Sequence, residues 1–135
     1  MRVLILTAAE AKINELAVSL QKALQREGAQ TDLVSADAGD GPVSTALYSL
    51  VCVVSGFKGW WKPKIPSEIE GLLKRTTRLE GKRGGAFVEA KVGSTKALRA
   101  LMADLERQGV MVADFGTLGG EEEIAAVAKR LKRLG

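Results

Sequence analysis

The apolar run Leu50–Ser55 constrains the fold of this chain more than any other segment. It reads LVCVVS, without the alternation of apolar and polar residues that a half-exposed strand shows. Such a run is typical of a strand that is buried on both faces, as in a parallel sheet covered by helices on either side. The residues that follow, Gly56–Trp61, include two glycines and two tryptophans. They predict a loop at the carboxyl end of this strand, where open α/β sheets bind their ligands.

Strand-like and helix-like segments alternate along the whole chain. The predicted strands are Arg2–Thr7, Gln30–Ser35, Leu50–Ser55, Gly85–Ala90 and Val110–Phe115. The predicted helices are Glu10–Glu27, Ser67–Thr76, Ser94–Gln108 and Glu121–Leu134, with a shorter one at Ser44–Ser49. This alternation predicts an α/β fold, a three-layer α/β/α sandwich around a five-stranded parallel sheet. No break in composition divides the chain, so we expect one domain over residues 1–135.

Composition excludes several classes of function. The chain has no histidine and one cysteine, which excludes zinc, copper and non-haem iron sites as well as Ser-His-Asp and Cys-His catalysis. Cys52 lies in the apolar run and is predicted to be a buried, inert thiol. No stretch approaches the roughly 20 apolar residues of a membrane span, and no signal peptide is visible, so we expect a cytoplasmic protein with no membrane partner. The net charge of +4 is typical of a mixed-charge surface.

Local patterns in this sequence resemble those of flavodoxins and occur in the same order. They are the N-terminal strand RVLILTA, the segment ALYSLVCVVSG, the helix residues Ile65, Pro66, Ile69, Leu72 and Leu73, and the L-x-G-K pattern Leu79–Lys82. The resemblance implies the strand order 2-1-3-4-5. It also implies non-covalently bound FMN and a role as an electron carrier rather than an enzyme with its own substrate. Three loops, after the first, third and fourth strands, would form the FMN site.

The first loop would hold the FMN phosphate at a helix N-terminus. The family pattern resembles T-x-T-G-x-T, and this chain has Thr7, Ala8, Ala9, Glu10, Ala11 and Lys12 at these positions. Glu10 replaces the glycine, and its carboxylate would repel a phosphate by about 1 kcal/mol at roughly 4 Å even in water. Alternatively, Thr7 and Glu10 form a capping box, in which case the protein fills its own anion site. Lys12 and Asn14 would favour a phosphate if Glu10 turned to solvent.

The second and third loops would hold the flavin ring. The second loop consists of Ser55, Gly56, Phe57, Lys58, Gly59, Trp60 and Trp61. Trp60 or Trp61 would stack on the ring; alternatively, one packs over the following helix and the other lies in a partner interface. The third loop contributes Glu89, Ala90, Lys91, Gly93 and Ser94, and it lacks the second aromatic residue of the family. Lys91 would either favour an anionic reduced flavin or be a solvated surface lysine.

Lys58, Lys62 and Lys64 surround the two tryptophans. We expect these lysines to attract an acidic redox protein. Nucleic acid is a weaker hypothesis, because one short loop is a small site for it. The sequence leaves two main functions open: an FMN-binding electron carrier, and a flavodoxin-fold binding module that has lost FMN. A flavin-dependent quinone or azo reductase is a third hypothesis, but no feature supplies a nicotinamide site. Both a monomer and a dimer remain open.

Overall fold

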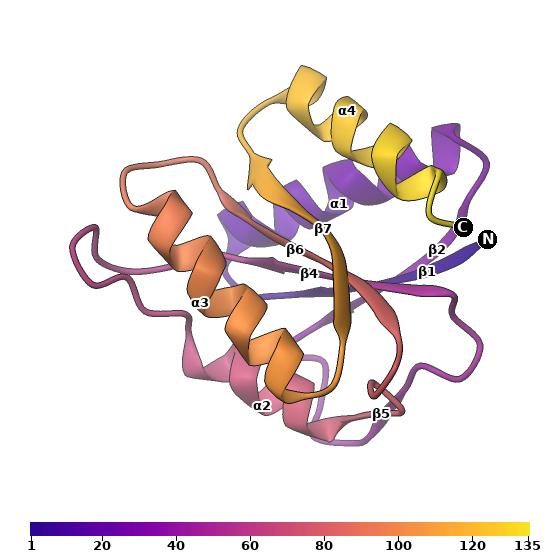
Figure 1. The fold of residues 1–135 in the computed structure, drawn as a ribbon, viewed down its shortest axis with the longest axis horizontal. Coiled ribbons are helices and arrows are strands. Elements are labelled where there is room, and N and C mark those ends of the chain that lie inside the picture. Colours follow the sequence, from indigo (N-terminus) through magenta and orange to yellow (C-terminus); the bar gives the residue numbers. More distant parts are fainter.

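A five-stranded parallel sheet forms the centre of the computed structural model, which describes residues 1–135 (Figure 1). Its strands lie in the order β2-β1-β4-β6-β7. They are β1 (Arg2–Thr7), β2 (Gln30–Ser35), β4 (Leu50–Ser55), β6 (Arg83–Glu89) and β7 (Met111–Leu118). In order of sequence these five strands have the arrangement 2-1-3-4-5, which confirms the predicted fold class.

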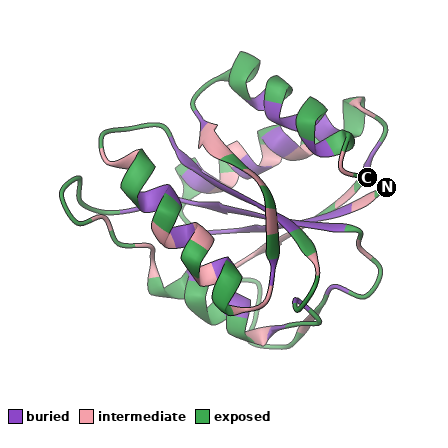
Figure 2. Ribbon diagram, in the orientation of Figure 1, coloured by how far each residue is buried: buried purple, intermediate pink, exposed green.

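Helices cover both faces of the sheet. The helices are α1 (Ala11–Arg26), α2 (Ser67–Arg75), α3 (Ser94–Arg107) and α4 (Glu121–Lys132). Helices α1 and α4 pack together on one face, and α2 and α3 lie on the other (Figure 1). All six residues of β4 are buried, as the unbroken apolar run predicts (Figure 2). None of the helices combines the length and apolar character needed to cross a membrane.

Cys52 lies in the middle of β4 and is fully buried, as predicted. Burial raises the pKa of its thiol, because the thiolate would lose its hydration. The only cysteine of the chain is therefore a packing residue with little nucleophilic character.

The predicted short helix at Ser44–Ser49 is wrong. Residues Val43–Ser44 form the strand β3, which pairs in parallel with β5 (Thr76–Thr77) in a separate two-stranded sheet. The buried Thr45 hydroxyl lies 2.8 Å from the carbonyl oxygens of Thr77 and Arg78. Threonine side chains that bond to distant backbone in this way favour extended or turn conformations over a helix.

Two strands have bounds that differ from the prediction. Strand β6 begins at Arg83, two residues before the predicted start at Gly85, because Gly84 belongs to it although glycine is rare in strands. A Cβ on Gly84 would lie 2.9 Å from the carbonyl oxygen of Val51, so only glycine allows β4 and β6 to approach here. Strand β7 continues past Phe115 to Leu118, paired with the end of β6.

The helices α1, α2 and α3 begin without a side-chain cap. The N-cap residues are Glu10, Pro66 and Gly93, and none of them makes a side-chain cap hydrogen bond. Gly93 has a φ of 95°, a conformation that glycine adopts readily, so the backbone turns into α3 without help from Ser94 or Thr95. The starts of α1 and α2 are instead fixed by contacts with other elements.

Candidate functional site

The three predicted loops meet at the carboxyl edge of the sheet. They follow β1, β4 and β6, which are neighbours in the sheet. The loops after β4 and β6 both extend to the left in Figure 1. The fold therefore brings together the residues that the sequence assigns to a cofactor site, although their binding role stays a prediction.

In the first loop, the residues become more exposed from Thr7 to Lys12, and the Thr7 hydroxyl bonds within the loop. Thr7 and Ala8 are buried, Ala9 is half-buried, and Glu10, Ala11 and Lys12 are exposed. The Thr7 hydroxyl donates to the carbonyl of Ala8 (3.1 Å) and is not directed toward a ligand. Glu10 turns to solvent, so the capping box between Thr7 and Glu10 is not formed.

A carboxylate from another helix occupies this loop instead. The backbone N–H of Ala9 donates to Oε1 of Glu68, in the first turn of α2, at 3.2 Å. This N–H is one of the groups that a phosphate at the start of α1 would need. Glu68 lies 59 residues further along the chain, and no local pattern in the sequence points to the contact.

Glu89 is the central charged residue of the site. It is the last residue of β6, and its side chain is only 7% exposed. Lys12 Nζ lies 3.2 Å from Oε1, Lys91 Nζ lies 3.4 Å from Oε2, and the backbone N–H of Phe57 donates to Oε2 at 3.4 Å. Each of these partners comes from a different predicted loop. We call this arrangement of Glu89, Lys12, Lys91 and Phe57 the Glu89 clasp.

Gly56 makes room for the Glu89 clasp. A Cβ at this position would lie 2.7 Å from Glu89 Oε2 and 3.0 Å from two carbon atoms of Ile13. The glycine therefore allows the carboxylate to lie against the backbone of the second loop, rather than giving that loop freedom to move. The neighbouring Ser55 is buried as well, and its hydroxyl donates to the carbonyl of Gly56 (2.7 Å).

The second and third loops touch each other. Lys91 Nζ donates to the carbonyl oxygen of Phe57 (2.8 Å) and lies 4.6 Å from the centre of the Phe57 ring. An ideal Cβ on Gly93 would lie 2.8 Å from Trp60 Cα, so the two backbones are in contact. Phe57 itself is buried in the core. Lys91 thus links the two loops. The sequence suggested two other roles for it, stabilising an anionic reduced flavin or lying free in solvent, and neither describes this contact. In the rest of the third loop Ala90 is exposed, and Gly93 and Ser94 are half-buried.

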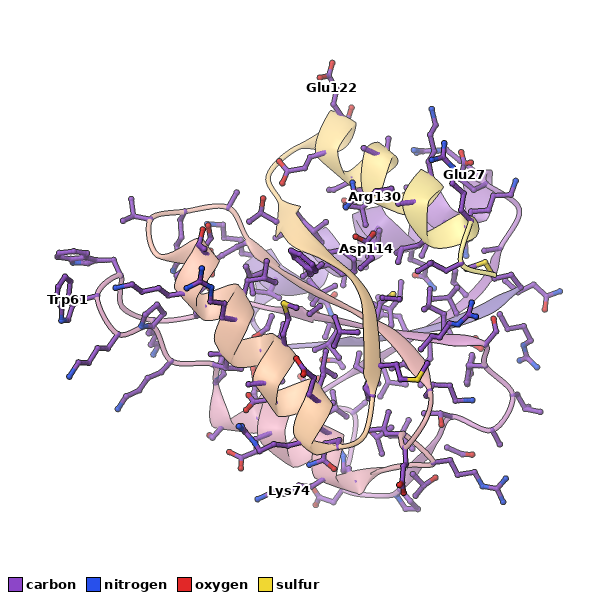
Figure 3. All side chains as sticks on the ribbon, viewed as in Figure 1. Glu27, Trp61, Lys74, Asp114, Glu122 and Arg130 are labelled. Atoms are coloured by element: carbon purple, nitrogen blue, oxygen red, sulfur yellow. The ribbon has the colours of Figure 1, made fainter.

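The two tryptophans project from the molecule. Trp60 is 63% exposed and Trp61 is 64% exposed, and Figure 3 shows Trp61 well outside the body of the protein. Their rings make an edge-to-face pair, with centroids 5.8 Å apart and an angle of 72° between the planes. Neither is buried over the following helix, so that part of the predicted alternative is wrong. Stacking on a flavin ring and a place in a partner interface both stay predictions.

The loop that carries the tryptophans is held in place at its base. The backbones of Lys58 and Lys64 pair in antiparallel fashion, through N–H···O bonds of 3.1 and 2.9 Å. Lys96, at the start of α3, donates to the carbonyl of Trp61 (3.3 Å) and lies 4.7 Å from a Trp61 ring centre. We call residues 58–64 the Trp finger. A pocket of about 420 Å³ lies beside it, on the side of α2, and is lined by Lys58, Lys64, Ile65, Pro66, Ser67 and Glu68.

Solved structures similar to this chain are flavodoxins. Flavodoxin 2 of Bacillus cereus superposes with a TM-score of 0.73 at 18% identity, over 98% of this chain and 99% of that chain. Flavodoxin 1 of Bacillus cereus superposes with a TM-score of 0.71 at 14% identity, over 99% of this chain and 96% of that chain. The Megasphaera elsdenii flavodoxin superposes with a TM-score of 0.71 at 18% identity, over 96% of this chain and 99% of that chain. The chain has a flavodoxin-like fold. No protein-family model and no curated protein sequence matches it.

The resemblance of the sequence to flavodoxins predicts FMN, and the residues present can be tested against that group. A phosphate at the first loop would lie beside the carboxylate of Glu68, which already accepts the Ala9 N–H. Glu10 turns to solvent, but Lys12 is paired with Glu89 and is not free to bind a phosphate. A ring held by the second and third loops would need space where those loops touch and where Glu89 lies. In this arrangement the residues do not fit FMN.

Proposed function

We propose that this protein is a flavodoxin-fold binding module that works without FMN. The observation that carries the proposal is the Glu89 clasp. A carboxylate that is 7% exposed lies among all three cofactor loops, and a lysine from each of two of those loops neutralises it. The clasp supplies from the protein itself the charge and hydrogen bonds that a bound ligand would otherwise provide.

The energetic cost of admitting FMN follows from these contacts. A phosphate dianion about 4 Å from one carboxylate is repelled by about 2 kcal/mol in water-like surroundings, twice the value for two single charges. Opening the clasp also breaks two ion pairs, each worth between about 1 kcal/mol in water and about 5 kcal/mol at an effective dielectric constant of about 20. Because Lys12 and Lys91 are 68% and 43% exposed, the lower value applies to each ion pair. The terms then sum to about 4 kcal/mol, which lowers affinity roughly a thousandfold.

An FMN-binding electron carrier is the second candidate function. The similarity to flavodoxins over nearly the whole chain favours it, and so do the exposed indoles at the edge where a flavin ring would lie. This function requires Lys12 and Lys91 to release Glu89, and the loops to separate. The acidic redox partner expected from the lysines belongs to this second candidate and stays a prediction.

Thermal unfolding with and without FMN separates the two functions. A ligand at 100 times its dissociation constant stabilises a protein by about 2.7 kcal/mol, which raises the Tm of a chain of this size by about 10 °C. We expect no rise in Tm with FMN at millimolar concentration, and no flavin absorbance in the purified protein. A rise of the size given would reject the flavin-free function. Riboflavin in place of FMN is the control, because it lacks the phosphate.

A further inference from the structure

We infer that the Trp finger is a membrane-docking loop, which places Trp60 and Trp61 among the headgroups of an anionic bilayer. The inference rests on the proposed function, because indoles stacked on a flavin would not be free to dock. Trp60 and Trp61 are 63% and 64% exposed, and Val92 in the adjoining third loop is 76% exposed. Figure 3 shows that Trp61 projects outward. Tryptophan is well suited to the membrane interface, because its ring is apolar and its N–H is polar.

The charge around the indoles matches an anionic surface. Lys58, Lys62 and Lys64 are all exposed and lie within the finger, and Lys96 contacts it from α3. The finger contains no acidic residue. Glu68 lines the pocket beside the finger, and its Oε1 accepts the N–H of Ala9. Basic residues next to apolar anchors bind anionic lipids, and the attraction falls with increasing salt.

The finger is ordered before any partner binds. The backbone pair between Lys58 and Lys64 closes its base, and Gly93 packs directly against the backbone at Trp60. Lys96 holds the carbonyl of Trp61. Docking therefore costs little loop entropy, which is the main cost that a flexible loop would have to meet.

Shape favours a bilayer over a protein or a nucleic acid. A stable protein interface buries about 800 Å² on each partner. A projecting loop of seven residues can bury that much only in a partner that has a groove of matching shape. A bilayer accepts a projecting loop without a complementary shape. No membrane partner is expected from the sequence, because no segment can span a bilayer. That limit does not apply to a loop that lies at the surface.

Sedimentation with vesicles tests the inference. The probes are vesicles of equal parts phosphatidylcholine and phosphatidylglycerol, and vesicles of phosphatidylcholine alone, at low and at physiological salt. We expect binding to the anionic vesicles, weakened by salt, and little binding to the neutral ones. The chain has two tryptophans, both in the finger, so a blue shift of their fluorescence on binding reports this loop alone.

Three variants sharpen the test. We expect Trp60→Ser/Trp61→Ser to lower partitioning at least about tenfold. Lys58→Gln/Lys62→Gln/Lys64→Gln should lower it about a hundredfold at low salt. The matched control is Met111→Ser/Phe115→Ser, which removes two apolar residues of β7 that are 56% and 54% exposed, and it should leave binding unchanged. All of the substituted side chains are exposed, so each variant should fold.

Two results would overturn the inference. One is failure of the wild type to bind the anionic vesicles at low salt, which would leave an acidic protein as the partner of the lysines. The other is equal binding by the wild type and the finger variants. A rise in Tm with FMN, together with vesicle binding by the FMN-free protein, would reject the flavin-free function but not docking by the finger of the FMN-free protein. Absence of vesicle binding, together with no rise in Tm with FMN, would reject the docking and not the flavin-free function.

Discussion

The Glu89 clasp predicts that its lysines stabilise the fold chiefly through the Glu89 carboxylate. Replacing both lysines, Lys12→Met/Lys91→Met, leaves a carboxylate that is 7% exposed without its ionic partners. Losing the partner of a buried charge costs about 3–5 kcal/mol. Lys12 and Lys91 are themselves 68% and 43% exposed, which places the expected loss at the lower end, at about 3 kcal/mol.

The matched background is Glu89→Gln, which keeps the shape of the side chain and removes its charge. In that background the same two substitutions cost about 1 kcal/mol, chiefly for the bond from Lys91 to the Phe57 carbonyl. The coupling is therefore about 2 kcal/mol, a shift of about 1 M in the urea midpoint. Urea unfolding of the four proteins measures it. Equal losses in the wild-type and Glu89→Gln backgrounds would refute the argument.

Three further predictions concern Gly93, Cys52 and Tyr48. Gly93→Ala should destabilise the fold by about 1–3 kcal/mol, because of its φ and its contact with Trp60. The control Gly71→Ala, inside α2 with open space around it, should stabilise by about 0.5–1 kcal/mol, and thermal unfolding compares the two. Cys52 should react with a thiol reagent at the global unfolding rate, and fast labelling of the native protein would show that it is not buried. Tyr48 donates to Asp32 at 2.6 Å, and this bond is the main cause that raises the tyrosine pKa. The stabilisation of the fold by this bond should therefore be complete below the pKa of a free tyrosine, and it should disappear as the pH rises through the higher pKa of the folded state. The chain has one tyrosine, so ultraviolet absorbance follows its titration directly, and a pKa equal to that of a free tyrosine would contradict the account.

Local patterns in the sequence were sufficient to predict the fold. The apolar run of β4 predicted a strand covered on both faces, and the alternation of segments predicted the parallel sheet. The order of its strands followed from the resemblance to flavodoxins. The errors fell on short or glycine-rich segments. Gly84 hid the start of β6 because glycine is untypical of strands. Thr45 was assigned to a helix because its bonds to Thr77 and Arg78 depend on residues more than 30 positions away.

The candidate site was predictable in position but not in its contacts. Each of the three loops was placed correctly at the carboxyl edge, because that follows from strand order. The carboxylate at the first loop came from Glu68 and not from Glu10, and no local rule relates Glu68 to Ala9. The burial of Glu89 likewise depends on where β6 ends relative to β4 and on the two lysines that reach it.

Titration of FMN with the wild-type protein tests the central claim most directly. The measurement follows flavin fluorescence alongside a variant in which the site is opened, Glu68→Gln/Glu89→Gly. We predict that the wild type leaves the flavin emission unchanged at protein concentrations up to the millimolar range, and that the opened variant quenches it. Saturable, stoichiometric quenching by the wild type at micromolar concentration would contradict the account.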